Sequence, residues 1–331
     1  MNSKIKKTAG AVMMMAASVL LLSCEKEQPG HDAASAGEKV PVEVSIPESA
    51  KTRVTDVGNE DMINNLQVFV FRPDGALDAY AIADDSRLVI ECTSGQKEFV
   101  AVINAPQLTA IQSRSQLAAM RSDLSHNSVS GLVMTGTATK TLSSVEESVE
   151  IVVSRLAARV SVSKITNAFS APGYANTPIV LKAIYISNVA ADACYLDSGQ
   201  PTKWYNTGDS KKDCPALLCD DALNAGITKS KPYTTPHYFY CYANPADAGS
   251  SGDSSSPQAT RLVIETQIRN VTYYYPVDIP EIAANHTYDV KEVKITRLGS
   301  EDPDQMVETG AVSVTIRIKD WDTGHTTEIT I

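Results

Sequence analysis

The chain has 331 residues, 43% of them hydrophobic, and its 39 acidic residues outnumber its 29 lysines and arginines, for a formal net charge of −10. This acidic balance argues against nucleic acid as a partner, because proteins that bind polyanions present basic surfaces. The hydrophobic content suffices for ordinary globular cores, and the length predicts two domains.

The first 24 residues predict export. Three lysines precede an apolar run from Ala11 to Leu22, which is too short to span a bilayer, and Ser23 stands before Cys24. These are the features of a secretory signal peptide. The cysteine directly after the break makes residues 1–23 look like a bacterial lipoprotein signal, so we expect Cys24 to be acylated and to become the first mature residue. An ordinary signal peptide with a chance cysteine is the alternative.

Residues 25–39 are polar and aperiodic, and they predict a disordered tether. A strand follows, Val40–Ile46, with Val40, Val42, Val44 and Ile46 on one face. The polar segment behind it offers Lys51 and Arg53, where a trypsin-like protease could cut and so remove the strand. Ordinary solvated loop charges are the competing interpretation of these two residues.

The body of the chain predicts an all-β fold, because short β-branched and aromatic runs recur between turn signals. One short helix is expected at about 107–124, behind Pro106. The boundary between two β-sandwich domains is expected near 154–157, although 149–165 could also form one nearly continuous strand. The expected strands are Leu66–Phe71, Arg87–Cys92, Phe99–Asn104, Val149–Val153, Arg159–Ile165, Ile179–Ile186, Tyr238–Tyr242, Arg261–Thr266, Val271–Val277 and Thr287–Thr296.

The C-terminal end carries a stripe with the same spacing as the first strand. Four β-branched residues again alternate with polar ones, and a shorter stripe ends on the last residue. Either stripe could be an ordinary terminal strand of its own domain, or the second could replace the first in another molecule. The residues of the two C-terminal stripes are Val312, Val314, Ile316 and Ile318, then Ile329 and Ile331.

Residues that could carry chemistry are few. The five histidines are scattered singly, no nucleophile or phosphate-binding motif occurs, and we expect neither an enzyme nor a cofactor. The acidic run of Glu301, Asp302, Asp304 and Glu308 lacks calcium-loop spacing, so no metal site is expected. Tyr273–Tyr275 with Trp204 and Tyr205 could form a carbohydrate platform or simply pack within a sandwich.

Five cysteines remain if Cys24 is acylated, too few for a disulfide scaffold. Two interpretations stay open, either scattered buried thiols, which the low density favours, or one bridge within a cluster. The cluster comprises Cys194, Cys214, Cys219 and Cys241.

Taken together, these features resemble the fimbrillins of Bacteroidales, the subunits of type V pili. The resemblance spans the chain in order and spacing rather than in any one diagnostic motif. It is carried by the lipoprotein signal, the strand followed by Lys51-Thr-Arg53, Ile63–Gly75, Ser154–Val160, Asn285–Val290, Gly299–Asp304 and Val312–Trp321.

The resemblance implies a lipoprotein precursor with two transthyretin-like β-sandwich domains, held in the outer membrane by lipid until an Arg- or Lys-specific surface protease cuts. Other fimbrial subunits, including copies of the chain itself, would then be its partners in a cell-surface fimbria. A tip or anchor subunit, or a monomeric surface lipoprotein that binds glycan or a host ligand, is the alternative. The implied segments are the signal at 1–23, a tether and excisable strand at 24–53, domains at 54–156 and 157–331, and donor strands at 311–331.

The implied roles are lipidation at Cys24, cleavage at Arg53 or, second, Lys51, and removal of the strand that carries Val40, Val42, Val44 and Ile46. The donor strands would carry Val312, Val314, Ile316 and Ile318, with Ile329 and Ile331.

Overall fold

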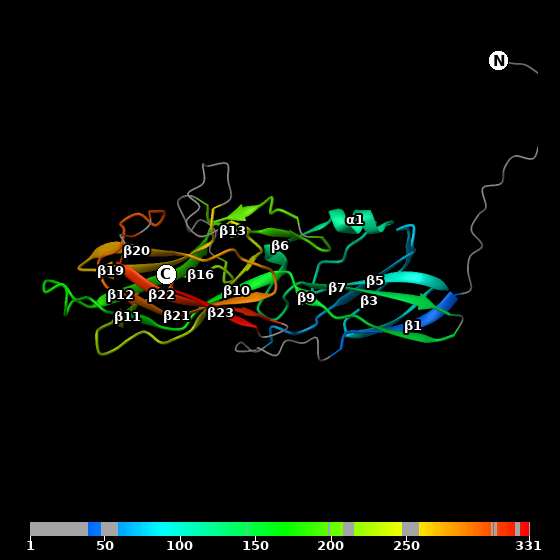
Figure 1. Ribbon diagram of the computed structural model, residues 1–331, viewed down its shortest axis with the longest axis horizontal. Coiled ribbons are helices and arrows are strands. Elements are labelled where there is room, and N and C mark those ends of the chain that lie inside the picture. Colours follow the sequence, from blue (N-terminus) through cyan, green and yellow to red (C-terminus); the bar gives the residue numbers. More distant parts are fainter. Residues whose placement is uncertain are drawn as a thin grey trace, which may run out of the picture. The chain divides into compact units, whose positions relative to one another are not determined.

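The computed structural model describes residues 39–47, 59–143, 145–197, 199–207, 215–246, 258–305, 307, 310–321 and 325–330, without the side chain of Ile329. Cys24, Lys51, Arg53 and Ile331 lie outside these residues. Within them almost all of the regular secondary structure is β-strand, so the predicted all-β fold is confirmed (Figure 1).

Two sheets enclose the first core. Sheet I has the order β4-β1-β8, and sheet II has the order β3-β2-β5-β7-β9. Alternate residues of β1, β2 and β5 point into the space between the sheets, where Val42, Val68 and Phe99 are fully buried. The strands are β1 Lys39–Ser45, β4 Arg87–Thr93 and β8 Glu147–Glu150, with β2 Leu66–Phe71, β3 Leu77–Ala83, β5 Gly95–Ile103, β7 Met134–Leu142 and β9 Ser154–Arg155.

Two further sheets enclose the second core. Sheet III has the order β18-β10-β21-β22-β23, with β11 beside β21, and sheet IV has the order β16-β12-β19-β20, with β17 beside β12. Phe239 and Ile316 from sheet III share this core with Ile184 and Ile264 from sheet IV. The strands are β10 Ala157–Val162, β11 Ile165–Asn167, β18 His237–Tyr242, β21 His286–Ile295, β22 Val312–Asp320 and β23 Thr326–Thr330, with β12 Ile179–Ser187, β16 Cys219–Asp220, β17 Ala225–Ile227, β19 Arg261–Ile268 and β20 Val271–Asp278.

Local chemistry explains the first hairpin of sheet II. Strand β2 coincides with the predicted run and ends at Arg72-Pro-Asp-Gly75. Gly75 adopts φ +81°, and its N–H donates to the carbonyl of Arg72 at 2.9 Å. The turn therefore uses glycine where the backbone needs positive φ.

The predicted helix is real but much shorter than expected. Only α1, Arg114–Ala119, is helical, and its N-cap Ser113 accepts a hydrogen bond from the N–H of Gln116. Ala110 has φ +62°, which interrupts the helix before Ser113. Beyond α1 the chain turns extended, because β6 (Arg121–Asp123) pairs with β14 (Asp192–Cys194) before the short 3₁₀ helix η2 (Leu124–His126).

Two further details differ from the sequence analysis. Residues 149–165 are not one strand but the separate strands β8, β9, β10 and the start of β11. Strands β3 and β7 were not predicted, because alanine occupies alternate positions of β3 and threonine alternate positions of β7, which leaves no continuous row of large apolar residues on either strand. The boundary between domains at 156/157 stays a prediction.

We expect the inward face of β1 to dominate its contribution to stability. Val44 is fully buried, whereas the neighbouring Glu43 is exposed on the opposite face. Val44→Ala should lower the free energy of unfolding by about 2 kcal/mol, through lost burial and a cavity. Glu43→Ala is the matched control and should change it by less than about 0.5 kcal/mol. Equal effects in urea unfolding would contradict the burial of this stripe.

Candidate functional site

The four stripe residues of β1 are all buried. Val42 and Val44 are fully inaccessible, and Val40 and Ile46 retain 1% and 4% of their exposure. They pack on the inward side chains of sheet II. The alternate residues Lys39, Pro41 and Glu43 face outward. The predicted period of two is thus realised, with one apolar row in the first core.

β1 is the middle strand of its sheet. Its residues 39–45 pair antiparallel with 93–87 of β4, and residues 42–45 pair parallel with 147–150 of β8. Pro41 has no N–H and precedes residues 42–45, which pair with β8. At the position of Pro41 the strand has no partner on that side among the described residues, so a missing donor is tolerated. Removing β1 would therefore leave two strand edges without their partner and one row of empty apolar pockets, a site that we call the β1 groove.

The C-terminal stripe lies in a different sheet. β22 pairs with β21 on one side and with β23 on the other. Val314 and Ile316 are buried in the second core, whereas Val312 and Ile318 are only half-buried against it. The two predicted stripes thus share their spacing, but β22 is the less completely buried of the two strands.

β23 is the last strand of sheet III. It pairs with β22 over residues 326–330, and Thr326, Thr327, Glu328 and Thr330 are exposed. The predicted second stripe cannot be traced further, because the side chain of Ile329 and all of Ile331 lie outside the described residues.

A buried ionic cluster was missed by the sequence analysis. Glu60 is fully buried, and its carboxylate accepts hydrogen bonds from Arg159 Nη1 at 2.8 Å and from the Tyr240 hydroxyl at 2.5 Å. The carbonyl of Glu60 accepts from Arg155 Nε and Nη2 at 3.2 and 3.1 Å. Burial, followed by the charge of Glu60, raises the pKa of the Tyr240 hydroxyl. The cluster fixes the segment that precedes β2 to β10 and β18.

Trp321 closes this cluster from the C-terminal side. Its ring is fully buried, with the guanidinium carbons of Arg155 and Arg159 at 4.7 and 5.4 Å from the ring centroid. The backbone N–H of Trp321 donates to the carbonyl of Asn285 at 3.0 Å. Trp321 directly follows β22, so cation–π contacts hold the end of the predicted donor strand against the same arginines that bind Glu60.

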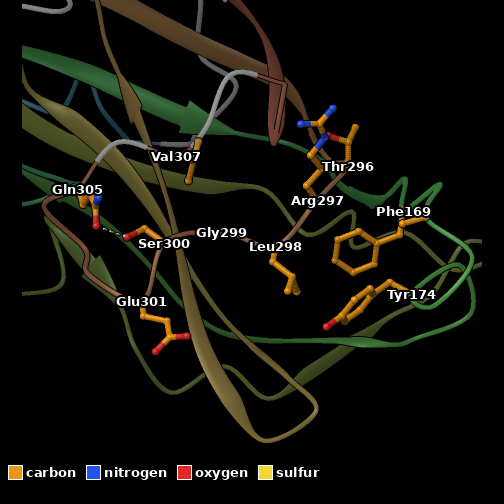
Figure 2. Close-up of a pocket in the computed structure, with 11 residues that line it drawn as sticks. Phe169, Tyr174, Thr296, Arg297, Leu298, Gly299, Ser300, Glu301, Gln305 and Val307 are labelled. Carbon is orange, nitrogen blue, oxygen red and sulfur yellow. Dashed lines mark hydrogen bonds between the residues drawn. The ribbon is translucent and has the colours of Figure 1, made fainter.

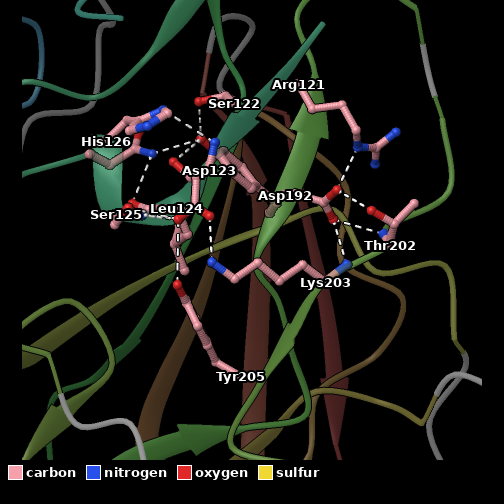
Figure 3. A network of polar contacts seen from close by, with 12 residues as sticks. Arg121, Ser122, Asp123, Leu124, Ser125, His126, Asp192, Thr202, Lys203 and Tyr205 are labelled. Carbon is pink, nitrogen blue, oxygen red and sulfur yellow. Dashed lines mark hydrogen bonds and ion pairs between the residues drawn. The ribbon is translucent and has the colours of Figure 1, made fainter. Parts of the chain in front are cut away.

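A second polar network joins β6 to residues near β14 (Figure 3). Lys203 Nζ lies 2.5 Å from Asp123 Oδ2, and the N–H of Ser125 donates to Asp123 Oδ1 at 2.9 Å. Asp192 accepts from Arg121 Nε at 2.5 Å and from the N–H of Thr202 at 2.7 Å. Partial burial raises the pKa of Asp123, but the hydrogen bonds from Lys203 and Ser125 outweigh it and lower this pKa to about 2.

The aromatic residues weighed as a carbohydrate platform or as sandwich packing belong to two different sheets. Tyr273–Tyr275 belong to β20, and Tyr275 is fully buried, with its hydroxyl on the carbonyl of Arg297. Trp204 and Tyr205 form β15, which pairs with β13 (Val189–Ala190) outside sheet IV.

The structure gives the bonding state of four cysteines. Cys219 is disulfide-bonded, which corrects the interpretation of scattered thiols at this position. Cys92, Cys194 and Cys241 are free, so the partner of Cys219 lies outside the described residues, as does Cys214.

One histidine takes part in a chain of hydrogen bonds that the sequence did not reveal. His237 Nδ1 lies 2.5 Å from Asp220 Oδ2, and its Nε2 lies 2.7 Å from the Tyr233 hydroxyl. His237 begins β18 and is buried, and Asp220 ends β16. These contacts tie together the ends of two strands from sheets III and IV.

Among the described residues, no group of three or more His, Cys, Asp or Glu side chains is placed to hold a metal ion. Of the acidic run, Glu308 lies outside these residues, and Asp302 accepts from the N–H of Asp304 at 2.9 Å. None of the helices in this part of the chain has the length and hydropathy needed to cross a bilayer.

Glu60→Gln keeps the shape of the side chain and removes its charge, which breaks the buried ion pair between the Glu60 carboxylate and Arg159. We expect the free energy of unfolding to fall by about 3 kcal/mol in urea titrations. Glu91→Gln is the matched control, since Glu91 is exposed and lies 4.0 Å from Lys39, and it should cost less than about 0.5 kcal/mol. Equal losses would show that the Glu60 pair is not buried.

Asp123 should make stability depend on acidity. Its pKa falls from 3.8 to about 2 in the fold, so its contribution is complete above about pH 4 and is lost as pH falls through about 2. Between about pH 5 and pH 2, the melting temperature of Asp123→Asn should therefore fall by less than that of the parent chain. Asp221→Asn, at an exposed position, is the control and should follow the parent curve. An Asp123→Asn curve parallel to the parent would contradict this role.

A family model described as Major fimbrial subunit protein (FimA) matches residues 39–183, a stretch that contains β1, sheets I and II and the start of the second core. No curated protein sequence matches the chain.

Solved structures share the fold over most of the chain. A candidate cell adhesion protein from Bacteroides eggerthii has TM-score 0.68 at 19% identity, covering 86% of this chain and 97% of its own. A fimbrilin from Porphyromonas gingivalis has TM-score 0.59 at 15% identity, with 85% and 97% covered. The tip fimbrial protein Mfa3 of the same species, truncated at its C-terminus, has TM-score 0.53 at 15% identity, with 86% and 100% covered.

At these identities the structural likeness concerns the fold, while the sequence match over residues 39–183 concerns the family. The resemblance drawn from the sequence is thereby confirmed: residues 39–183 match the major fimbrial subunit (FimA) family model, and the chain shares its fold with a solved fimbrilin.

Proposed function

We propose that this chain is a structural subunit of a cell-surface fimbria and that it polymerises by strand exchange, with β22 of one subunit filling the β1 groove of the next. The observation that carries the proposal is the position of β1. It is the middle strand of sheet I, and its four buried residues have the same spacing as the stripe of β22.

Proteolysis would control assembly. While β1 occupies its groove, no other strand can enter. Cutting after Arg53, or second after Lys51, would separate β1 from the rest of the chain, and the vacated groove would expose unpaired backbone and apolar pockets. A strand from another subunit would relieve both, in the mode of β-strand addition. An Arg- or Lys-specific surface protease is therefore the proposed processing partner.

The energetics favour a durable joint. A fully buried Val or Ile contributes about 1.5–3 kcal/mol, so refilling the four pockets of the β1 groove would restore about 6–12 kcal/mol of burial there, besides a hydrogen-bond ladder. β22 would give up the burial of Val314 and Ile316 in its own core and would gain burial at the half-buried Val312 and Ile318. The balance rests mainly on the groove, which is costly to leave empty.

The remaining parts follow the same proposal. Cys24 would carry the lipid that holds the precursor in the outer membrane, and the cut would release the subunit from it. Residues 54–156 and 157–331 would be the two domains of the mature subunit, a division supported by a second core that is built mainly from residues after 156. The proposed role is structural rather than enzymatic.

Processing can be tested directly. The purified precursor is treated with an Arg-specific protease, its new N-terminus is sequenced, and its size is compared by electrophoresis with and without heating. We expect a start at Val54 and multimers that dissociate only on heating. The double variant Lys51→Ala/Arg53→Ala should stay uncut and monomeric, and Lys229→Ala/Lys231→Ala, at an exposed turn, should behave like the parent. Identical oligomerisation before and after cleavage would overturn strand exchange.

The donor role has its own test. Val312→Glu places a charge in the stripe of β22, and Ser313→Glu places it on the exposed face next to that residue. Because a buried charge is strongly unfavourable, cleaved Val312→Glu should fail to polymerise alone yet still accept a strand from cleaved parent protein. Ser313→Glu should polymerise normally. Normal polymers of Val312→Glu would exclude β22 as the donor.

A further inference from the structure

A cavity of about 520 Å³ opens in the second half of the chain (Figure 2). One wall is the segment after β11, which contributes Phe169 and Tyr174, and the other is the connection from β21 to β22, which contributes Leu298, Glu301 and Gln305. The cavity lies within the size range of small-molecule sites. Neither the β1 groove nor the stripe of β22 lines it.

The wall from the β21–β22 connection is held in place. Ser300 and Tyr274 exchange two backbone hydrogen bonds, at 2.7 and 3.0 Å, and the Tyr275 hydroxyl donates to the carbonyl of Arg297 at 2.9 Å. Gly299 is required by the close approach, because a Cβ there would lie 2.4 Å from the carbonyl oxygen of Tyr274. This wall is therefore pre-organised against β20.

The aromatic wall is equally fixed. The N–H of Phe169 donates to Asn167 Oδ1 at 3.2 Å. The ring centroids of Phe169 and Tyr174 lie 5.9 Å apart, with an angle of 58° between the ring planes. The guanidinium of Arg269 covers Tyr174 at 4.2 Å from the ring centroid. A ligand that enters the cavity would thus meet a preformed site, which lowers the entropic cost of binding.

The lining combines apolar surface with hydrogen-bonding groups of both kinds. The half-buried side chains of Leu298 and Val307 provide apolar contact, and the buried ring of Phe169 lies behind Tyr174. The Glu301 carboxylate accepts hydrogen bonds, and the Tyr174 hydroxyl and Gln305 amide can donate or accept. Figure 2 shows the two aromatic rings on one side of the cavity and Glu301, Ser300 and Gln305 on the other.

Charge on the lining selects against ionic ligands. Arg297 and Glu301 are both exposed and carry opposite charges, so an anion attracted by one is repelled by the other, and the same holds for a cation. A neutral molecule with an apolar face and several hydroxyl groups fits this combination. We propose that the cavity binds a neutral saccharide unit, with its apolar face on Tyr174 and Leu298 and its hydroxyls on Glu301 and Gln305.

This binding would be independent of polymerisation, so it is tested on the uncleaved precursor. Saturation-transfer NMR would be recorded with methyl α-mannoside, methyl β-glucoside, methyl β-galactoside, N-acetylglucosamine and L-fucose, and with N-acetylneuraminic acid as an anionic probe. We expect at least one neutral sugar to receive saturation and to show a measurable Kd. No transfer to any neutral sugar, or transfer to the anionic probe alone, would overturn the proposal.

Variants place the sugar in the cavity. Glu301→Gln, at an exposed position that leaves the fold intact, should weaken the Kd about tenfold, since a hydrogen bond to a charged group is lost. Tyr174→Ala should weaken it at least as much. Glu150→Gln on β8 and Tyr205→Ala on β15 are the matched controls and should leave the Kd unchanged. Sugar binding that Glu301→Gln and Tyr174→Ala leave unaltered would place the site elsewhere and refute the proposal.

Discussion

The first core is closed by a strand that is hydrogen-bonded along both of its edges. β1 joins β4 to β8, and these two strands have no pairing with each other in the described part of the chain, so sheet I exists only through β1. The same strand supplies one complete apolar row to the core, opposite sheet II. Stability and accessibility of this core therefore depend on the first strand of sheets I and II, and the proposed cut behind β1 would sever it from the chain without breaking any other strand.

The Glu60 cluster limits what such a cut would disturb. Glu60 lies in sequence between the proposed cleavage residues and β2, and Arg155, Arg159 and Tyr240 hold it by its carboxylate and its carbonyl. Everything from Glu60 onward would stay attached when β1 leaves. Trp321 packs on the same two arginines, so the end of β22 and the start of the remaining chain share one buried set of charges. Movement of either segment must be accommodated by this cluster.

The sequence predicts the parts of this fold that follow from period-two patterns and turn chemistry. The stripe of β1, strand β2 with its Gly75 turn and the stripe of β22 are visible because large β-branched residues alternate with polar ones. The helix was predicted to be too long, because the residue type of Ala110 does not reveal the positive φ that interrupts it. The Glu60 cluster and the cavity beside Tyr174 could not be predicted, because their members are distant in sequence and carry no motif, and the disulfide of Cys219 was one of several possible pairings.

The mixed pairing of sheet I has a consequence for any assembly built through it. β8 runs parallel to β1, and β4 runs antiparallel to it. A replacement strand can therefore restore both hydrogen-bond ladders only if it runs in the same direction as β1. If the replacement strand were shifted along the groove by one residue, its apolar row would face outward. Only registers that differ by an even number of residues keep this row in the core. A fibre joined in this way would be polar, with a vacant groove at one end and an unused strand at the other, and those two ends would need different terminating subunits.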